Sequence, residues 1–171
     1  MLQIIRYPDP FLREVSEPVS QINDEIRALA REMIETMYAS RGLGLAAPQV
    51  RVHKRLVIVD LDHEKHDPRV MINPRIIRRG KTKETGVEGC LSLPGVEAKV
   101  TRPAEVTLEA MNLEGETIEY QGTGLTAKAF QHEIDHLDGI LFIDKVSMAA
   151  KLAIRSELKR LETSYEEGND G

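Results

Sequence analysis

The chain has 171 residues, 41% of them hydrophobic and 30% charged, which predicts a single globular domain that can bury a core without disulfide bonds. Its apolar runs are too short to span a membrane, and a net charge of −5 with 4% aromatic residues argues against DNA binding. The single cysteine, Cys90, excludes an internal disulfide, and the start of the chain lacks the layout of a signal peptide, so we expect a cytoplasmic protein.

The first predicted element is a helix over residues 24–40, where apolar side chains recur at helical spacing behind Asn23 or Asp24 as the cap. The segment GLGLAAPQ follows at residues 42–49. It lacks the lysine and the preceding strand of a phosphate-binding loop, so a Rossmann or P-loop site is not expected. We expect either an ordinary glycine-containing turn or a loop that lets a ligand approach the backbone, with Gln49 offering an amide donor.

Strands are predicted in the middle of the chain. Two β-branched runs, at residues 55–61 and 69–77, have the composition of strands, the second broken by Pro74. Apolar and polar residues alternate on both sides of a turn at residues 112–115, which predicts a hairpin.

Between these strands, residues 88–95 (EGCLSLPG) surround Cys90 with residues that permit turns. This context predicts a segment that presents backbone groups and a thiolate. A buried cysteine that packs as a small hydrophobic residue is the alternative.

Helical patterns return at residues 125–137, ended by Gly139, and at residues 147–164, capped by Ser147. A helix first, strands in the middle and helices last predict an α+β fold rather than alternating βαβ units. We assign residues 1–165 to one domain and residues 166–171 to a polar flexible tail.

The chemical motif of the chain is His-Glu-x-x-His at residues 132–136, inside a predicted helix. Positions i and i+4 share one helix face, so His132 and His136 can bind one metal ion while Glu133 acts as a general base. The alternative is a solvated helix face with two surface histidines. No histidine follows His136, so Cys90 is the best candidate for the third ligand, with water at the fourth position, as in an open catalytic site.

The segments GLGLAAPQ, EGCLSLP and QHEIDH, in this order and at this spacing, resemble the three signature motifs of peptide deformylases, and the similarity runs from Ile4 to Ser147. This family removes the N-terminal formyl group from nascent bacterial and organellar proteins. The resemblance implies mixed and antiparallel sheets around a central metal-binding helix, with helices at both ends of the chain. It implies N-formylmethionyl nascent peptides as substrates, and a bacterial source, or an organellar one if a transit peptide is missing from this chain.

The resemblance also implies which residues perform the chemistry. One divalent metal ion would be bound, Fe(II) in the native enzyme, with Zn(II), Ni(II) or Co(II) also able to occupy the site, and its ligands would be Cys90, His132 and His136. Glu133 would be the general acid/base, while Gln49 and the backbone N–H of Leu91 would stabilise the oxyanion.

An apolar pocket beside the metal would accept the methionine side chain. By resemblance its substrate contacts are Leu43, Gly44, Gly89, Leu125 and Ala129. Leu45 and Val87 are expected to pack in the core instead. Glu97 stands where some family members have arginine, which leaves open the contacts to the substrate backbone at that point.

Other polar residues are expected to support the site or to lie on the surface. We expect Glu88 and Arg102 to form a charge pair that braces the Cys90 segment, and Asp135 to be a partner behind the metal ligands. The remaining histidines are expected to be ordinary surface residues: His53, His63 and His66.

From the residues alone, three other functions remain open: a peptidase with the same three ligands, a nonenzymatic metal-stabilised domain, and a hydrolase with a cysteine nucleophile. The chain is short for the second wall of a peptidase cleft. It also has no second cysteine to close a structural metal site.

The last predicted helix has a basic stripe, in which Lys151, Arg155 and Lys159 recur four residues apart. Its apolar side would consist of Leu152, Ile154, Leu158 and Leu161. We expect either a solvated helix face or weak docking to ribosomal RNA phosphates, which the acidic residues Glu166, Glu167 and Asp170 would oppose.

Overall fold

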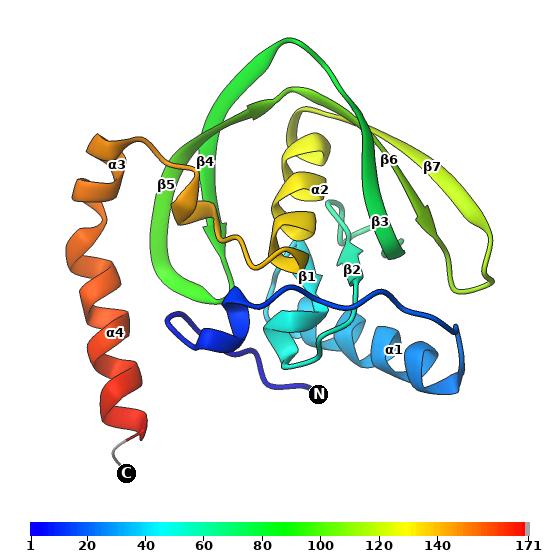
Figure 1. The fold of residues 1–171 in the computed structure, drawn as a ribbon, viewed down its shortest axis with the longest axis horizontal. Helices are drawn as coiled ribbons and strands as arrows, with labels where there is room; N and C mark the ends of the chain where they lie inside the picture. Colours follow the sequence, from blue (N-terminus) through cyan, green and yellow to red (C-terminus); the bar gives the residue numbers. More distant parts are fainter. Residues whose placement is uncertain (170–171) are drawn as a thin grey trace.

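The computed structural model describes residues 1–169, and its main layer is a five-stranded antiparallel sheet (Figure 1). In spatial order its strands are β1 (Gly44–Ala46), β2 (Leu56–Val59), β3 (Arg69–Arg79), β6 (Glu105–Met111) and β7 (Thr117–Thr123). Each neighbouring pair runs antiparallel.

Two helices cover opposite faces of this sheet because β2 is apolar on both sides. Leu56 and Ile58 pack with α1 (Asp24–Ala39), whereas Val57 and Val59 pack with α2 (Gly124–Leu137). Successive strand residues point to opposite faces, so a strand buried on both faces is a continuous apolar run. The helix α2 is thereby held at the centre of the molecule.

A two-stranded antiparallel ribbon forms the second sheet. β4 (Lys83–Cys90) pairs with β5 (Leu93–Pro103), and the chain turns between them at Leu91 and Ser92. Figure 1 shows this ribbon, in green, beside the yellow helix α2. The ribbon therefore delivers the end of β4, and with it Cys90, to the face of α2.

The C-terminal helices pack on the outer side of the ribbon (Figure 1). Short 3-10 turns lie before α1 (η1, Pro10–Arg13), after β1 (η2, Ala47–Val50) and after α2 (η3, Phe142–Asp144), and α3 (Met148–Ala153) and α4 (Arg155–Asn169) are the last elements of the described residues. One apolar cluster joins the α3–α4 segment to β5 through Ile154, Leu158, Leu161, Leu93 and Val96. In the part of the chain that the structure describes, no helix combines the length and apolar character needed to cross a bilayer.

The α+β prediction is confirmed, as are several elements. α1 starts behind Asn23, whose side chain accepts a hydrogen bond from Ile26 N at 3.1 Å. The predicted hairpin is β6–β7, and the predicted strand at residues 55–61 contains β2. α2 ends before Gly139, which has the left-handed φ of 73° that glycine favours.

Two predicted boundaries are wrong. Pro74 does not break its strand: β3 continues to Arg79, with a register irregularity between Ile72 and Arg75 and a left-handed φ of 52° at Asn73. Residues 147–164 do not form one helix. The backbone leaves helical geometry at Ile154 (φ −97°, ψ 2°), a residue that is buried against the ribbon, so α3 and α4 are separate.

Helix α4 continues through Glu166 and Glu167 to Asn169, residues assigned to the tail, while residues 170–171 lie outside the described part. The expected apolar side is buried at Ile154, Leu158 and Leu161, but Leu152 is 65% exposed. The segment around Cys90 belongs to the β4–β5 ribbon, and the glycine-rich segment includes β1 and η2, so both contain regular structure that the sequence did not reveal.

Candidate active site

Helix α2 and strand β4 bring the three predicted metal ligands together. The i, i+4 spacing places His132 and His136 on the side of α2 that faces the ribbon, and Cys90 ends β4 there. Cys90 Sγ lies 3.3 Å from His136 Nε2, and the candidate ligand atoms of the three residues lie within 4.8 Å of one another. One thiolate and two imidazoles at this spacing fit a tetrahedral metal ion with one open position.

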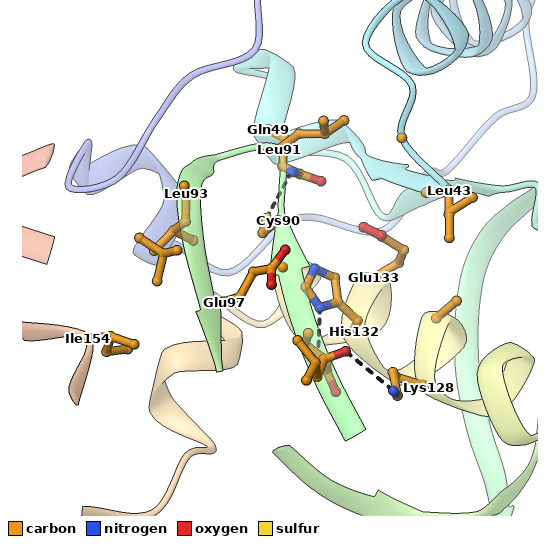
Figure 2. A pocket seen from close by; sticks show the side chains of 18 of the residues that line it. Leu43, Gln49, Cys90, Leu91, Leu93, Glu97, Lys128, His132, Glu133 and Ile154 are labelled. Atoms are coloured by element: carbon orange, nitrogen blue, oxygen red, sulfur yellow. Dashed lines mark hydrogen bonds and ion pairs between the residues drawn. The ribbon is translucent and has the colours of Figure 1, made fainter. Parts of the chain in front are cut away.

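The ring of His132 is oriented by Glu88. His132 Nδ1 donates to Glu88 Oε1 at 3.0 Å, which leaves Nε2 as the nitrogen that can bind a metal (Figure 2). Burial would raise the pKa of Glu88, but hydrogen bonds from His132 and Arg102 outweigh burial and lower that pKa to about 2. Glu88 is therefore an anion behind the histidine.

The surroundings shift the pKa values of the two histidines in opposite directions. Burial disfavours a charged His132, but hydrogen bonds to Cys90 and Glu88 outweigh it and raise its pKa well above the usual value. Burial lowers the pKa of His136 well below the usual value. The imidazole of His136 is therefore neutral and can offer a nitrogen lone pair to a metal ion.

Arg102 on β5 joins the two strands of the ribbon to helix α2 behind the site. Its guanidinium donates to Glu88 Oε2 at 2.6 Å, to Glu88 Oε1 at 3.0 Å and to Asp135 Oδ2 at 2.8 Å. The expected charge pair of Glu88 and Arg102 is present, and both residues are buried. Asp135 supports the site through Arg102; its carboxylate makes no hydrogen bond to a metal-site histidine among the described residues.

Glu133 lies beside the candidate ligands with its carboxylate shielded from solvent. Its Oε1 has no hydrogen-bond partner among the residues that the structure describes. Burial raises its pKa to about 7. A buried carboxyl group that is free of fixed partners and has a pKa near neutrality can both accept and return a proton.

Gln49 approaches Cys90 from the other side of the pocket (Figure 2). The turn η2 fixes this buried side chain: Oε1 accepts from Ala46 N at 2.9 Å, and Nε2 donates to Ser92 Oγ at 3.1 Å and to Cys90 Sγ at 3.5 Å. Leu91 follows Cys90 directly. The structure therefore gathers the side-chain amide of Gln49 and the backbone of residues 90–91 at one point.

A cavity of about 670 Å³ is lined by Gln49, Cys90, Leu91, His132 and Glu133, whereas His136 is buried and is not part of its lining. All five predicted substrate contacts line it: Leu43, Gly44, Gly89, Leu125 and Ala129. Leu45 is fully buried in the core, as expected, but Val87 is 54% exposed and lines the cavity, so its assignment to the core is wrong. Glu97 also lines the cavity and is labelled near Cys90 in Figure 2.

Sequence reasoning missed the residues that close the cavity from the far side. Lys128 lines it from α2, and Ile154 and Glu157 line it from the C-terminal helices (Figure 2 labels the first two). No local motif marks Ile154 and Glu157, because only the packing of the C-terminal helices on β5 brings them to the site, whereas Lys128 shares a helix face with His132 four residues later.

Comparisons with known proteins agree with this geometry. A family model described as polypeptide deformylase matches residues 1–151. The peptide deformylase of Acidobacterium capsulatum is 44% identical over 165 residues, which cover 95% of this chain and 96% of that protein. The peptide deformylase of Neisseria gonorrhoeae is 47% identical over 161 residues, which cover 94% and 95%. A crystal structure of the peptide deformylase from Plasmodium falciparum is similar with a TM-score of 0.92 at 40% identity, covering 96% of this chain and 97% of that chain.

Proposed function

The chain belongs to the peptide deformylase family, and from this premise we propose that Cys90, His132 and His136 hold the divalent metal with which it removes the N-terminal formyl group from nascent polypeptides. The observation that supports this assignment is the convergence of three ligand atoms within 4.8 Å beside the buried Glu133. Family membership also removes the alternatives of a peptidase, a structural metal domain and a cysteine-nucleophile hydrolase.

When bound, the metal supplies Lewis acidity that makes a water-derived nucleophile available near neutral pH. Glu133 accepts the proton of that water and returns it to the amine of methionine as formate departs. Its unpartnered Oε1 and its pKa of about 7 suit both transfers. Glu88 holds His132 Nδ1 and so keeps the ring in one tautomer and orientation.

Attack on the formyl carbon places negative charge on the formyl oxygen. We assign Gln49 Nε2 and the backbone N–H of Leu91 as the donors to this oxygen. Gln49 is buried and held by Ala46 and Ser92, so its amide is oriented before the charge develops, and the N–H that is directed at Cys90 Sγ is the one that would donate to the oxygen. Donors of this kind contribute about 3 to 4 kcal/mol each to transition-state stabilisation.

The methionine side chain would occupy the apolar part of the cavity. Leu43 and Leu125 are 42% and 53% exposed in the structure, so their side chains offer apolar surface that a ligand can cover. Ala129 on α2 has a short side chain and Gly44 on β1 has none, so both positions leave room for the substrate backbone beside Glu133.

We propose Fe(II) as the native metal, because one thiolate and two imidazoles form a donor set of intermediate softness that accepts Fe(II), and also Zn(II), Ni(II) and Co(II). Anaerobic purification followed by metal analysis tests this identity. The same protein should release formate from a formyl-methionyl peptide and nothing from the acetylated peptide. A metal-loaded protein that released no formate would overturn the proposed site.

We place the protein in the cytoplasm, where it would meet nascent chains, and propose weak ribosome docking through Lys151, Arg155 and Lys159. All three side chains are exposed, and no ion pair engages them within the described chain, but the break at Ile154 places Lys151 on α3 and the other two on α4. A solvated helix face is the alternative. Glu166 and Glu167, both exposed on α4, oppose contact with RNA, and Asp170 lies outside the described residues.

Charge reversal of the basic stripe separates the two alternatives. Replacing the three cations by glutamate should lower ribosome co-sedimentation at low salt and leave activity on a free formyl-peptide unchanged. Unaltered co-sedimentation would mean that the three cations form only a solvated helix face. A loss of peptide activity would show that they support the fold.

A further inference from the structure

The glycine segment, residues 42–44, is pressed between two groups of the proposed catalytic machinery. A Cβ atom built on Gly42 would lie 2.6 Å from Cδ1 of Leu91, and one built on Gly44 would lie 2.5 Å from Oε2 of Glu133. Neither position has room for a side chain. The backbone of this segment therefore limits how closely the side chains of Leu91 and Glu133 can approach it; Figure 2 labels both residues and Leu43.

The opposite side of the segment is held by the loop that follows β2. His63 Nε2 donates to the carbonyl oxygen of Gly42 at 2.8 Å, and Asp60 N donates to the carbonyl oxygen of Leu43 at 2.9 Å. Two consecutive carbonyls are thus anchored by one loop. His63 is half-buried, so the expectation of an ordinary surface histidine is wrong for this residue.

Tyr38 of α1 contacts this loop through one hydrogen bond and two ring contacts. Its hydroxyl donates to Oδ2 of Asp60, while Asp62 N donates to Oδ1 of the same carboxylate at 3.0 Å. The Tyr38 ring meets His63 edge to face at 4.9 Å between centroids and stacks on His66 at 4.5 Å. Burial raises the pKa of Tyr38, which keeps the hydroxyl protonated as a donor.

We propose that His63, with Asp60 and Tyr38 behind it, is a positioning residue that holds the glycine segment against Leu91 and Glu133. None of the three lines the cavity in the described chain, so they act through the segment and do not touch substrate. The inference rests on the proposed function only for the roles of Leu91 and Glu133; the contacts from His63 to the segment stand without it.

Two substitutions at His63 separate its hydrogen bond from its ring. His63→Phe keeps the edge contact with Tyr38 and removes the donor to Gly42, whereas His63→Gln removes the ring and keeps an N–H donor near the same place. His66→Phe is the matched control, because it keeps the stack on Tyr38 and has no hydrogen bond to the segment to lose.

For His63→Phe we expect kcat on a formyl-methionyl peptide to fall about tenfold with KM nearly unchanged, since loosening by a fraction of an ångström misplaces catalytic groups without removing substrate contacts. His63→Gln should recover most of the loss, and His66→Phe should match the parent protein. Metal content and the unfolding midpoint, measured alongside, should stay at the parent values in all three variants.

Hydrogen exchange at the Asp60 amide gives a readout that needs no activity, because this N–H bonds to Leu43 O. It should exchange faster in His63→Phe than in His63→Gln. Equal exchange in these variants, or an equal kcat in the parent and His63→Phe, would overturn the inference, as would the same loss of kcat in His66→Phe. If the parent protein were inactive on formyl-peptides, the proposed function would be refuted. The hydrogen-exchange rates of the Asp60 amide in the two His63 variants would then decide the positioning role of His63.

Discussion

An alanine at Gly44 would place a methyl group against the carboxylate of Glu133. Its Cβ would lie 2.5 Å from Oε2 and 2.9 Å from Cδ, about 1 Å closer than ordinary contact. Gly44 has no left-handed φ and pairs with Val59, so the backbone tolerates alanine and resists moving away. The carboxylate must therefore shift by about 1 Å. A displacement of that size in a catalytic group lowers kcat about 100-fold, or about 2.7 kcal/mol in activation free energy.

The assay is formate release from a formyl-methionyl peptide, with metal content measured on the same sample. Gly86→Ala is the control, because its Cβ would come within 2.3 Å of Lys128 Nζ, the end of a flexible chain that can move aside. We expect the control to keep kcat within about twofold of the parent protein, since nothing catalytic has to shift. If Gly44→Ala retains parental kcat with its metal bound, the close approach to Glu133 does not set the position of the general base.

Three further variants test the roles assigned to the site. Glu133→Ala should lower kcat by at least about 100-fold while the metal stays bound, because the glutamate is not a ligand; loss of metal together with activity would contradict that role. Cys90→Ser should lose metal on dialysis against a chelator, since a serine hydroxyl stays protonated, and full occupancy would remove Cys90 from the site. Arg102→Met should lower the free energy of unfolding by about 3 to 5 kcal/mol in urea titrations of metal-loaded protein, because Glu88 is left buried without its guanidinium; a change below about 1 kcal/mol would show that the carboxylate finds another partner.

Sequence patterns predicted the helices and strands whose buried residues recur at the regular spacing of a helix or a strand. α1 and α2 each bury one apolar stripe on one face of the main sheet, so helical spacing marks both. The hairpin β6–β7 shows alternation and a turn at residues 112–115. β2 is recognisable as an apolar run because both its faces are covered.

Strand β4 escaped prediction because its only buried side chain is charged. Most of its residues are exposed or half-exposed, two of them are glycines, and the buried position is Glu88. A carboxylate can occupy such a position only because Arg102, paired across the ribbon with Glu84, reaches along it to form two hydrogen bonds. The charge pair itself was expected, but two charged residues 14 positions apart form no alternating pattern that would mark β4 as a strand.

Glu88 also shows which part of the site could be predicted from the sequence and which could not. The proposed ligands follow from a local motif on α2 and from the single cysteine, so this donor set could be proposed without knowledge of the fold. The orientation of His132 depends instead on Glu88, and Glu88 is held by an arginine that also binds Asp135 on α2. Ribbon and helix are thus joined by the charges that keep the histidine in place, which predicts that a substitution in this network changes metal affinity and unfolding free energy together.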